Sequence, residues 1–397
     1  MARRRPLRFG IFTAPVHSVG RNPTLYLEQD LQLFEHVDRL GFDEAWVGEH
    51  HSGGAEIIGS PEMFIAAAAQ RTQQVRLGTG VVSLPYHHPF HVAERIVFAD
   101  HLTRGRVMFG VGPGALATDA NMLGMDPLQA RPRMEESLEA IVALLTSEEP
   151  VTRRTEWFEL NEARLNLRPH QWPHPEIAIA TTVSPNGARN AGRFGAGILS
   201  LSASSPSGLA KLDEHWGIWS SEAEAHGHVA DRANWRVVAP IHLARTRDQA
   251  LKDIQYGIEF WVDYFTSVVR WPDAPDTKDA KRYTEWLIES GSAAIGTPDD
   301  CIELISRIED HCGGFGCFLA MAHDWADPEA TRRSYELMAS EVFPAFQGSV
   351  DWPKRSHEWA YEKADAFMER QVLASEQASE RHERAVADRE EKKRGKR

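Results

Sequence analysis

The chain has 397 residues, of which 42% are hydrophobic and 25% charged, and its formal net charge at pH 7 is −13. This composition is typical of a globular protein with a large core, and the acidic balance argues against nucleic acid and anionic membranes as partners. The three cysteines form no CxxC pair, which argues against a disulfide framework and a structural zinc site. No apolar run approaches the roughly 20 residues of a membrane span, and no apolar segment follows the basic residues 3–5, so we expect a cytoplasmic protein.

The first part of the chain alternates short apolar runs with segments of helical periodicity. Strands are predicted at residues 7–13, 45–47, 75–82 and 106–111, and helices at residues 25–40, 62–72, 89–102 and 131–145. Gly41 follows the first helix as a C-cap signal, and Pro89 begins the third, where its missing N–H has no cost. Short apolar strands between helices are typical of a parallel sheet that is covered on both faces.

Four further strands complete the pattern after a proline-containing excursion at residues 152–175. They are predicted at residues 177–181, 198–201, 235–244 and 317–321, and a long helix is predicted at about 246–269. A closed (β/α)8 barrel and an open doubly wound sheet both accommodate this alternation, but the count of eight favours the barrel.

We therefore predict an α/β fold: a (β/α)8 TIM barrel with insertions at residues 1–350, followed by a charged helical tail at 351–397. Opposite charges interleave in the tail, which is typical of an exposed helix, and we expect its distal end to be disordered. The polar segment 271–281 contains two prolines and interrupts the helical pattern. A mobile lid over a pocket and a plain surface insertion both fit this segment.

Candidate functional residues follow the ends of four predicted strands. They lie in residues 49–51 (EHH), 83–89 (SLPYHHP), 110–114 (GVGPG) and 181–185 (TTVSP). In a barrel these loops open onto one mouth, where catalytic groups gather. Histidine is the side chain best suited to proton transfer near neutral pH. Because His50 and His51 are adjacent, one should point into the mouth and the other into packing.

The histidines near this mouth also allow a metal-hydrolase interpretation. They are His50, His51, His87, His88 and His91. Barrel hydrolases place an HxH pair on one strand, whereas adjacent histidines point to opposite faces. No aspartate ends the last predicted strand, although Asp324 follows soon after. We therefore predict that the site holds no metal.

The glycine-rich segment also fits a dinucleotide fingerprint formally. Gly110, Gly112 and Ala115 match G-x-G-x-x-A after a strand, but no clean helix start follows and no acidic residue ends a second strand about 20 residues on. We interpret Gly112 and Gly114 instead as a close backbone approach to a flat ligand, with a tight turn as the structural alternative.

A phosphate-binding site is predicted after the fifth strand. Thr181, Thr182 and Ser184 precede a predicted helix at residues 186–193. Hydroxyls and free backbone N–H groups at a helix start bind phosphate well. Ser184 as a simple N-cap is the alternative, and the two roles are compatible.

Three segments carry a family resemblance. Residues 42–51 (FDEAWVGEHH), 77–89 (LGTGVVSLPYHHP) and 105–114 (GRVMFGVGPG) are similar, in this order, to the bacterial luciferase family of flavin-dependent monooxygenases. The resemblance spans residues 7–347, and residues 295–347 resemble the limonene monooxygenase branch more closely than luciferase. The family implies a (β/α)8 fold.

The resemblance also implies residue roles. His50 falls at the catalytic histidine, which manages protons around the flavin peroxide. The implied flavin-binding positions are Gly80 and Val81 against the isoalloxazine ring, often through a cis peptide bond, Thr181, Thr182 and Ser184 at the phosphate, and Ser200 on a strand near the flavin. Luciferase has a reactive cysteine and a phosphate-holding arginine at Gly112 and Pro113, and an acidic residue at Thr181. Phosphate recognition here must therefore rest on other groups, and light emission is not implied.

The implied activity is a two-component monooxygenase. A separate flavin reductase would supply reduced flavin, FMN with FAD as the alternative. Dioxygen would then oxygenate a small apolar substrate of the terpene or alkene type through a flavin C4a-hydroperoxide, in a homo-oligomer. Two alternatives stay open: a deazaflavin (F420)-dependent oxidoreductase on the same barrel, and a flavin-binding barrel without catalysis.

Overall fold

The computed structural model describes residues 6–14, 16–271 and 273–395, which belong to two compact units, Met1–Gln347 and Gly348–Arg397. The first unit is a closed parallel barrel, whose strands are β1 (Arg8–Thr13), β2 (Glu44–Val47), β3 (Arg76–Thr79), β5 (Val107–Gly112), β8 (Ile177–Thr181), β9 (Gly197–Ser200), β10 (Trp235–Leu243) and β12 (Cys317–Ala322). β12 pairs with β1 and β9 with β10, so no edge is left open. This closure confirms the barrel and excludes the open sheet.

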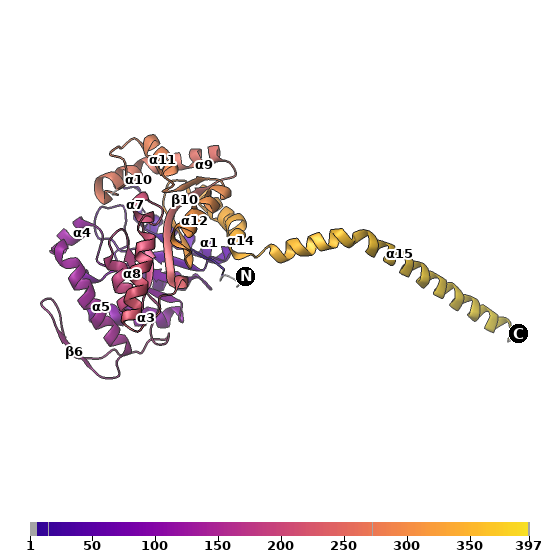
Figure 1. Cartoon of the computed structure of the whole chain (residues 1–397), viewed down its shortest axis with the longest axis horizontal. Helices are drawn as coiled ribbons and strands as arrows, with labels where there is room; N and C mark the ends of the chain where they lie inside the picture. The colour runs from indigo at the N-terminus through magenta and orange to yellow at the C-terminus, as the bar shows by residue number, and fades with distance from the viewer. Residues whose placement is uncertain (1–5, 15, 272, 396–397) are drawn as a thin grey trace. The chain divides into compact units, whose positions relative to one another are not determined.

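Helices surround the barrel (Figure 1). They are α1 (Pro23–Leu40), α2 (Pro61–Ala69), α3 (Pro89–Thr103), α4 (Ala117–Met122), α5 (Ala130–Thr146), α6 (Asn186–Arg193), α7 (Pro206–Leu209), α8 (Leu212–Ala225), α9 (Arg247–Asp253), α10 (Ile258–Tyr264), α11 (Ala280–Glu289), α12 (Pro298–Cys312), α13 (Pro328–Leu337) and α14 (Phe343–Gln347). α1 ends at Gly41, whose φ of 82° suits glycine. The sequence signals therefore mark this boundary correctly.

Each barrel strand has two apolar faces. One face fills the barrel with side chains such as Phe12, Trp46, Met108, Leu199 and Leu319. The other face packs on the helices in a larger cluster. Both faces are buried, which explains why the strands appear in the sequence as continuous apolar runs.

The segment predicted as one helix at 246–269 is instead broken. It forms α9, a 3₁₀ turn at Ile254–Tyr256, α10 and a π turn at Phe265–Val269. A Cβ on Gly257 would lie 1.9 Å from the carbonyl oxygen of Asp324, so the backbone passes very close to the loop after β12. The excursion predicted at residues 152–175 begins as an antiparallel hairpin of β6 (Val151–Arg154) with β7 (Glu159–Ala163), and its prolines follow the hairpin.

Two short strands extend the sheet. β4 (Val82–Ser83) pairs with β5, and β11 (Ala294–Gly296) pairs with β10. The second unit contains α15 (Asp351–Arg394), which has no buried residue. This helix includes most of the distal end for which we expect disorder, and residues 396–397 of that end lie outside the described part of the chain. Among the described residues, no helix combines the length and apolar character that crossing a membrane requires.

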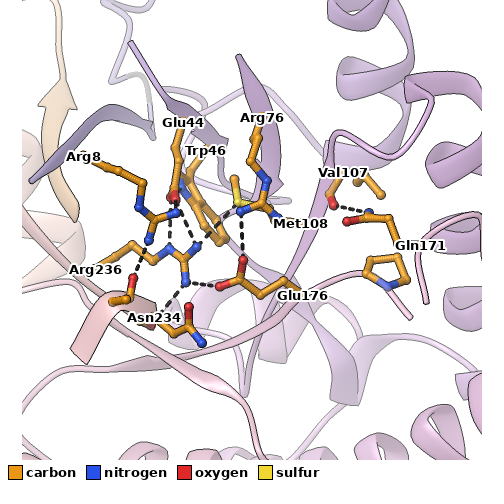
Figure 2. A network of polar contacts seen from close by, with 12 residues as sticks. Arg8, Glu44, Trp46, Arg76, Val107, Met108, Gln171, Glu176, Asn234 and Arg236 are labelled. Carbon is orange, nitrogen blue, oxygen red and sulfur yellow. Dashed lines mark hydrogen bonds and ion pairs between the residues drawn. The ribbon is translucent and has the colours of Figure 1, made fainter. Parts of the chain in front are cut away.

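A charged network lies inside the amino-terminal end of the barrel (Figure 2). The guanidinium of Arg236 is fully buried and donates to both carboxylate oxygens of Glu44, each at 3.0 Å. It also donates to Glu176, which accepts a second hydrogen bond from Arg76 at 2.8 Å. Arg8 donates to Glu44 at 2.6 Å. Each of these carboxylates thus contacts two guanidinium groups.

Candidate active site

The loops after β1, β2, β4, β5 and β8 meet at the carboxyl edge of the barrel, because all of these strands are parallel. His50 follows β2, and its side chain is 16% exposed. Its Nδ1 lies 3.2 Å from Oδ2 of Asp119 on α4, and its Nε2 lies 3.2 Å from Oε2 of Glu56 in the loop after β2. The imidazole therefore sits between two carboxylates.

The environment of His50 favours its protonated form. Burial alone would lower the pKa of His50, but the negative charges of Glu56 and Asp119 outweigh it and raise the pKa above its usual value. Asp119 is itself fixed, because it accepts hydrogen bonds from the hydroxyl of Ser52 and the backbone N–H of His51, the latter at 3.1 Å. The geometry suits a group that holds and donates a proton.

His51 points to different partners than His50, as expected for adjacent residues. Its Nε2 lies 2.8 Å from Oε1 of Glu49, and Nε2 of His87 lies 2.6 Å from the same oxygen. The other oxygen of Glu49 accepts the backbone N–H of Ser83 at 2.8 Å. The structure thus brings His87 to the mouth with His51, through a carboxylate that is completely buried.

Glu49, His51 and His87 also form a potential metal-ligand set, since their ligand atoms all lie within 4.8 Å of one another. In the structure the two histidine nitrogens are already hydrogen bonded to the Glu49 carboxylate. The five histidines considered for a metal do not converge as a group: His50 has its own carboxylates, and His91 is 68% exposed. Absence of a metal stays a prediction.

The peptide bond between Gly80 and Val81 is cis and lies between β3 and β4. A Cβ on Gly80 would come within 2.7 Å of the ring of Phe12, and a Cβ on Gly112 within 2.7 Å of Val81. Glycine at both positions therefore leaves room for the side chains of Phe12 and Val81 at this end of the barrel. Gly114 has a φ of 87°, and a Cβ there would meet the hydroxyl of Tyr86 at 2.3 Å.

The mouth has an apolar floor. Four partly buried side chains pack on the interior cluster of the barrel; they are Ala14, Val81, Leu201 and Met321. A flat ring system laid on this floor would be shielded from water on one face.

The predicted phosphate segment begins at the end of β8. Thr181 is buried, and its hydroxyl donates to the carbonyl of Ser184 at 3.2 Å, which closes the loop. The hydroxyl of Ser184 accepts the N–H of Asn186 at 3.4 Å at the start of α6, and Thr182 is exposed. Thr181 therefore shapes this loop, while Thr182 and Ser184 are available to a ligand.

His215 on α8 is a neighbour of this loop that sequence reasoning missed. The residue is fully buried, and neither ring nitrogen has a hydrogen-bond partner among the described residues. Burial lowers the pKa of His215, opposed by Glu214 and by the backbone of Val183 and Ser184. A neutral imidazole behind the loop carried no signal in the sequence, because its helix is far along the chain.

Ser200 does not join the other predicted residues. Its hydroxyl accepts the indole N–H of Trp235 at 3.0 Å, and Trp235 belongs to the cluster between barrel and helices. The side chain of Ser200 therefore faces the helix layer. Leu199, the preceding residue, faces the barrel interior.

Glu56, Asp119 and Tyr264 are further site residues that the sequence did not reveal. The hydroxyl of Tyr264, the last residue of α10, donates to Glu56 at 3.1 Å across 208 positions of chain. Each residue lies in a different loop or helix, so no local motif connects them. Only a pattern of covariation between distant positions could have identified them.

Comparisons with known proteins agree on one family. The model of luciferase-like monooxygenases matches residues 7–312. The chain is 44% identical over 375 residues to limonene 1,2-monooxygenase of Rhodococcus erythropolis, covering 94% of this chain and 96% of that protein. It is 45% identical over 362 residues to 4-hydroxyprotoasukamycin monooxygenase of Streptomyces nodosus subsp. asukaensis, covering 91% and 98%.

A solved structure supports the same fold. The oxygenating constituent of 3,6-diketocamphane monooxygenase of Pseudomonas putida, a type II Baeyer–Villiger monooxygenase in complex with FMN, superposes with a TM-score of 0.71. The two chains are 25% identical, and the match covers 85% of this chain and 98% of that one.

Proposed function

Because the chain belongs to the luciferase-like monooxygenase family, we propose that it uses reduced FMN and dioxygen to oxygenate a small apolar substrate of the terpene or alkene type. The observation that carries the proposal is that His50 is held between two carboxylates at the carboxyl end of the barrel, where the cis peptide bond Gly80–Val81 also lies. An imidazole beside an apolar floor can handle protons while excluding bulk water.

The residues present fit FMN. The backbone at Gly80–Val81 and the apolar floor would take the isoalloxazine ring, and the loop from Thr181 to Ser184, with the start of α6 behind it, would take the phosphate. FMN rather than FAD is favoured because the FMN-bound diketocamphane relative shares the fold. That relative is an oxygenating constituent, which supports a separate flavin reductase as partner here.

Reduced FMN would supply the chemistry of oxygen activation, through a C4a-hydroperoxide. The chain's own contribution is positioning. The floor of Ala14, Val81, Leu201 and Met321 excludes water, and His50, held between Asp119 and Glu56, stores and supplies a proton.

The His50→Ala variant tests the proposal. It should still bind reduced FMN, measured by anaerobic fluorescence titration, but should lose about 10²–10⁴-fold in oxygenated product on a panel of terpenes. His91→Ala, an exposed histidine on α3, is the matched control and should keep full activity. Full activity of His50→Ala would refute the role of His50, and a wild type that turns over without consuming oxygen would refute the oxygenase.

A further inference from the structure

Four side chains form a continuous chain of polar contacts that ends at the mouth. The hydroxyl of Tyr264 donates to Oε1 of Glu56 at 3.1 Å, and Oε2 of Glu56 lies 3.2 Å from Nε2 of His50. Nδ1 of His50 lies 3.2 Å from Asp119. Glu56 is 7%, Asp119 1% and Tyr264 4% exposed, so water does not compete effectively for these contacts.

The surrounding backbone is adapted to this contact chain. A Cβ on Gly53 would lie 2.8 Å from the hydroxyl of Tyr264, and Gly53 has a φ of 77°, which favours glycine. Behind Tyr264, Trp261 and Phe265 stack with ring centroids 3.9 Å apart and fix the end of α10. The loop after β2 and α10 therefore depend on each other for their positions.

We propose that Glu56 and Tyr264 are positioning residues that, together with Asp119, hold the imidazole of His50 in place and keep a proton on it. This inference rests on the proposed function and adds two residues that act on it through His50.

The charges around His50 favour the protonated state. Glu56, Asp119 and, at longer range, Glu49 raise its pKa, whereas burial lowers it. Burial raises the pKa of Glu56 against the opposing effects of His50, Tyr264 and His17. Both shifts mean that this pair keeps a proton to a higher pH than either group would alone.

The test uses two variants and two matched controls in the full chain. Glu56→Gln removes the charge at nearly constant volume, and Tyr264→Phe removes only the hydroxyl. Glu62→Gln removes another buried carboxylate, and Tyr283→Phe removes a buried hydroxyl that has no partner among the described residues. The readout is the titration of His50 by NMR in flavin-free protein, with the signal assigned from a His50→Gln variant.

We expect Glu56→Gln to lower the midpoint of the His50 titration by about one pH unit or more, Tyr264→Phe to lower it by less, and both controls to leave it unchanged. In turnover with reduced FMN, the upper limb of the pH profile should shift down with the titration of His50 in Glu56→Gln.

Each result decides a separate point. An unchanged His50 titration in both variants would overturn the positioning roles. Failure of the wild type to oxygenate any terpene or alkene would overturn the proposed function itself, while the NMR titration would still decide the roles of Glu56 and Tyr264.

Discussion

The two ends of the barrel both bury charged groups, but the ratio of positive groups to carboxylates differs between them. At the amino-terminal end, Arg236, Arg8 and Arg76 match Glu44 and Glu176 (Figure 2). At the carboxyl end, His17 and His50 each lie between two carboxylates. Charges that are fully matched by arginine stay ionised and hold strands together. Two carboxylates around one histidine instead favour its protonated form, and that proton is available for catalysis.

The shifts in pKa express the same difference. Although burial alone would raise it, Arg236 and Arg76 lower the pKa of Glu176 to about 2. At the mouth, the pKa of His50 and that of Glu56 both lie above their usual values. In barrels of this class, the amino-terminal face serves stability and the carboxyl face serves catalysis.

The largest effect that we predict comes from removing an arginine at the amino-terminal end, where the buried charges are matched. Arg236→Leu leaves Glu44 and Glu176 buried with fewer counter-charges, and should lower the free energy of unfolding in urea by about 3–5 kcal/mol. Arg76→Leu is the matched control: its side chain is 29% exposed, and its pair with Glu176 should be worth about 1 kcal/mol or less. Equal losses in the two variants would mean that burial does not set the strength of this network.

The sequence predicts regular elements well and this network not at all. The strand Ile177–Thr181 and the helix Asn186–Arg193 match their predicted bounds, because apolar runs and glycine or proline boundaries are local signals. Glu44 stands at the start of an apolar run, and its partner Arg236 follows 192 positions later. Charges inside a barrel contradict the local pattern, and only the closed fold brings them together.

The same limit applies at the mouth. The position of His50 after a strand is visible in the sequence, and the structure places it there. Its partners Glu56 and Asp119 lie in segments without regular periodicity or in a short helix. The break of the predicted long helix at Gly257 was likewise hidden, since its cause is a carbonyl of a distant loop.

A second histidine at the carboxyl end, His17, should make the stability of the fold depend on pH. His17 lies between Asp30, at 3.1 Å, and Asp324, at 2.7 Å. Burial lowers the pKa of His17, but the hydrogen bonds and charges of both aspartates outweigh it and raise the pKa from 6.5 to about 9. Because the folded pKa is the higher one, the stabilisation is complete below pH 6.5 and disappears as the pH rises through about 9.

His17→Gln should therefore be less stable than wild type by about 2 kcal/mol at pH 6, and the difference should shrink at pH 9.5. Urea unfolding at several pH values measures it, with the exposed His91→Gln as control. Arg236→Leu should show no such dependence in this window, since burial is outweighed by the opposite charges, which lower the pKa of Glu176 to about 2 and raise the pKa of Arg236. A difference for His17→Gln that is constant with pH would contradict the assigned ion pairs.

The smallest effect separates ligand-facing groups at the mouth from groups that support the fold. Ser184→Ala removes a hydroxyl that accepts a single long hydrogen bond, 3.4 Å from the N–H of Asn186. We expect unfolding stability to change by less than about 0.5 kcal/mol. Reduced-FMN affinity, measured by anaerobic titration, should fall by about 1 kcal/mol, roughly five-fold. Ser220→Ala, whose hydroxyl donates within α8, should leave affinity unchanged. If Ser184→Ala instead lost stability and kept its affinity, this loop would belong with the matched charges at the other end of the barrel, as a part of the fold rather than of the site.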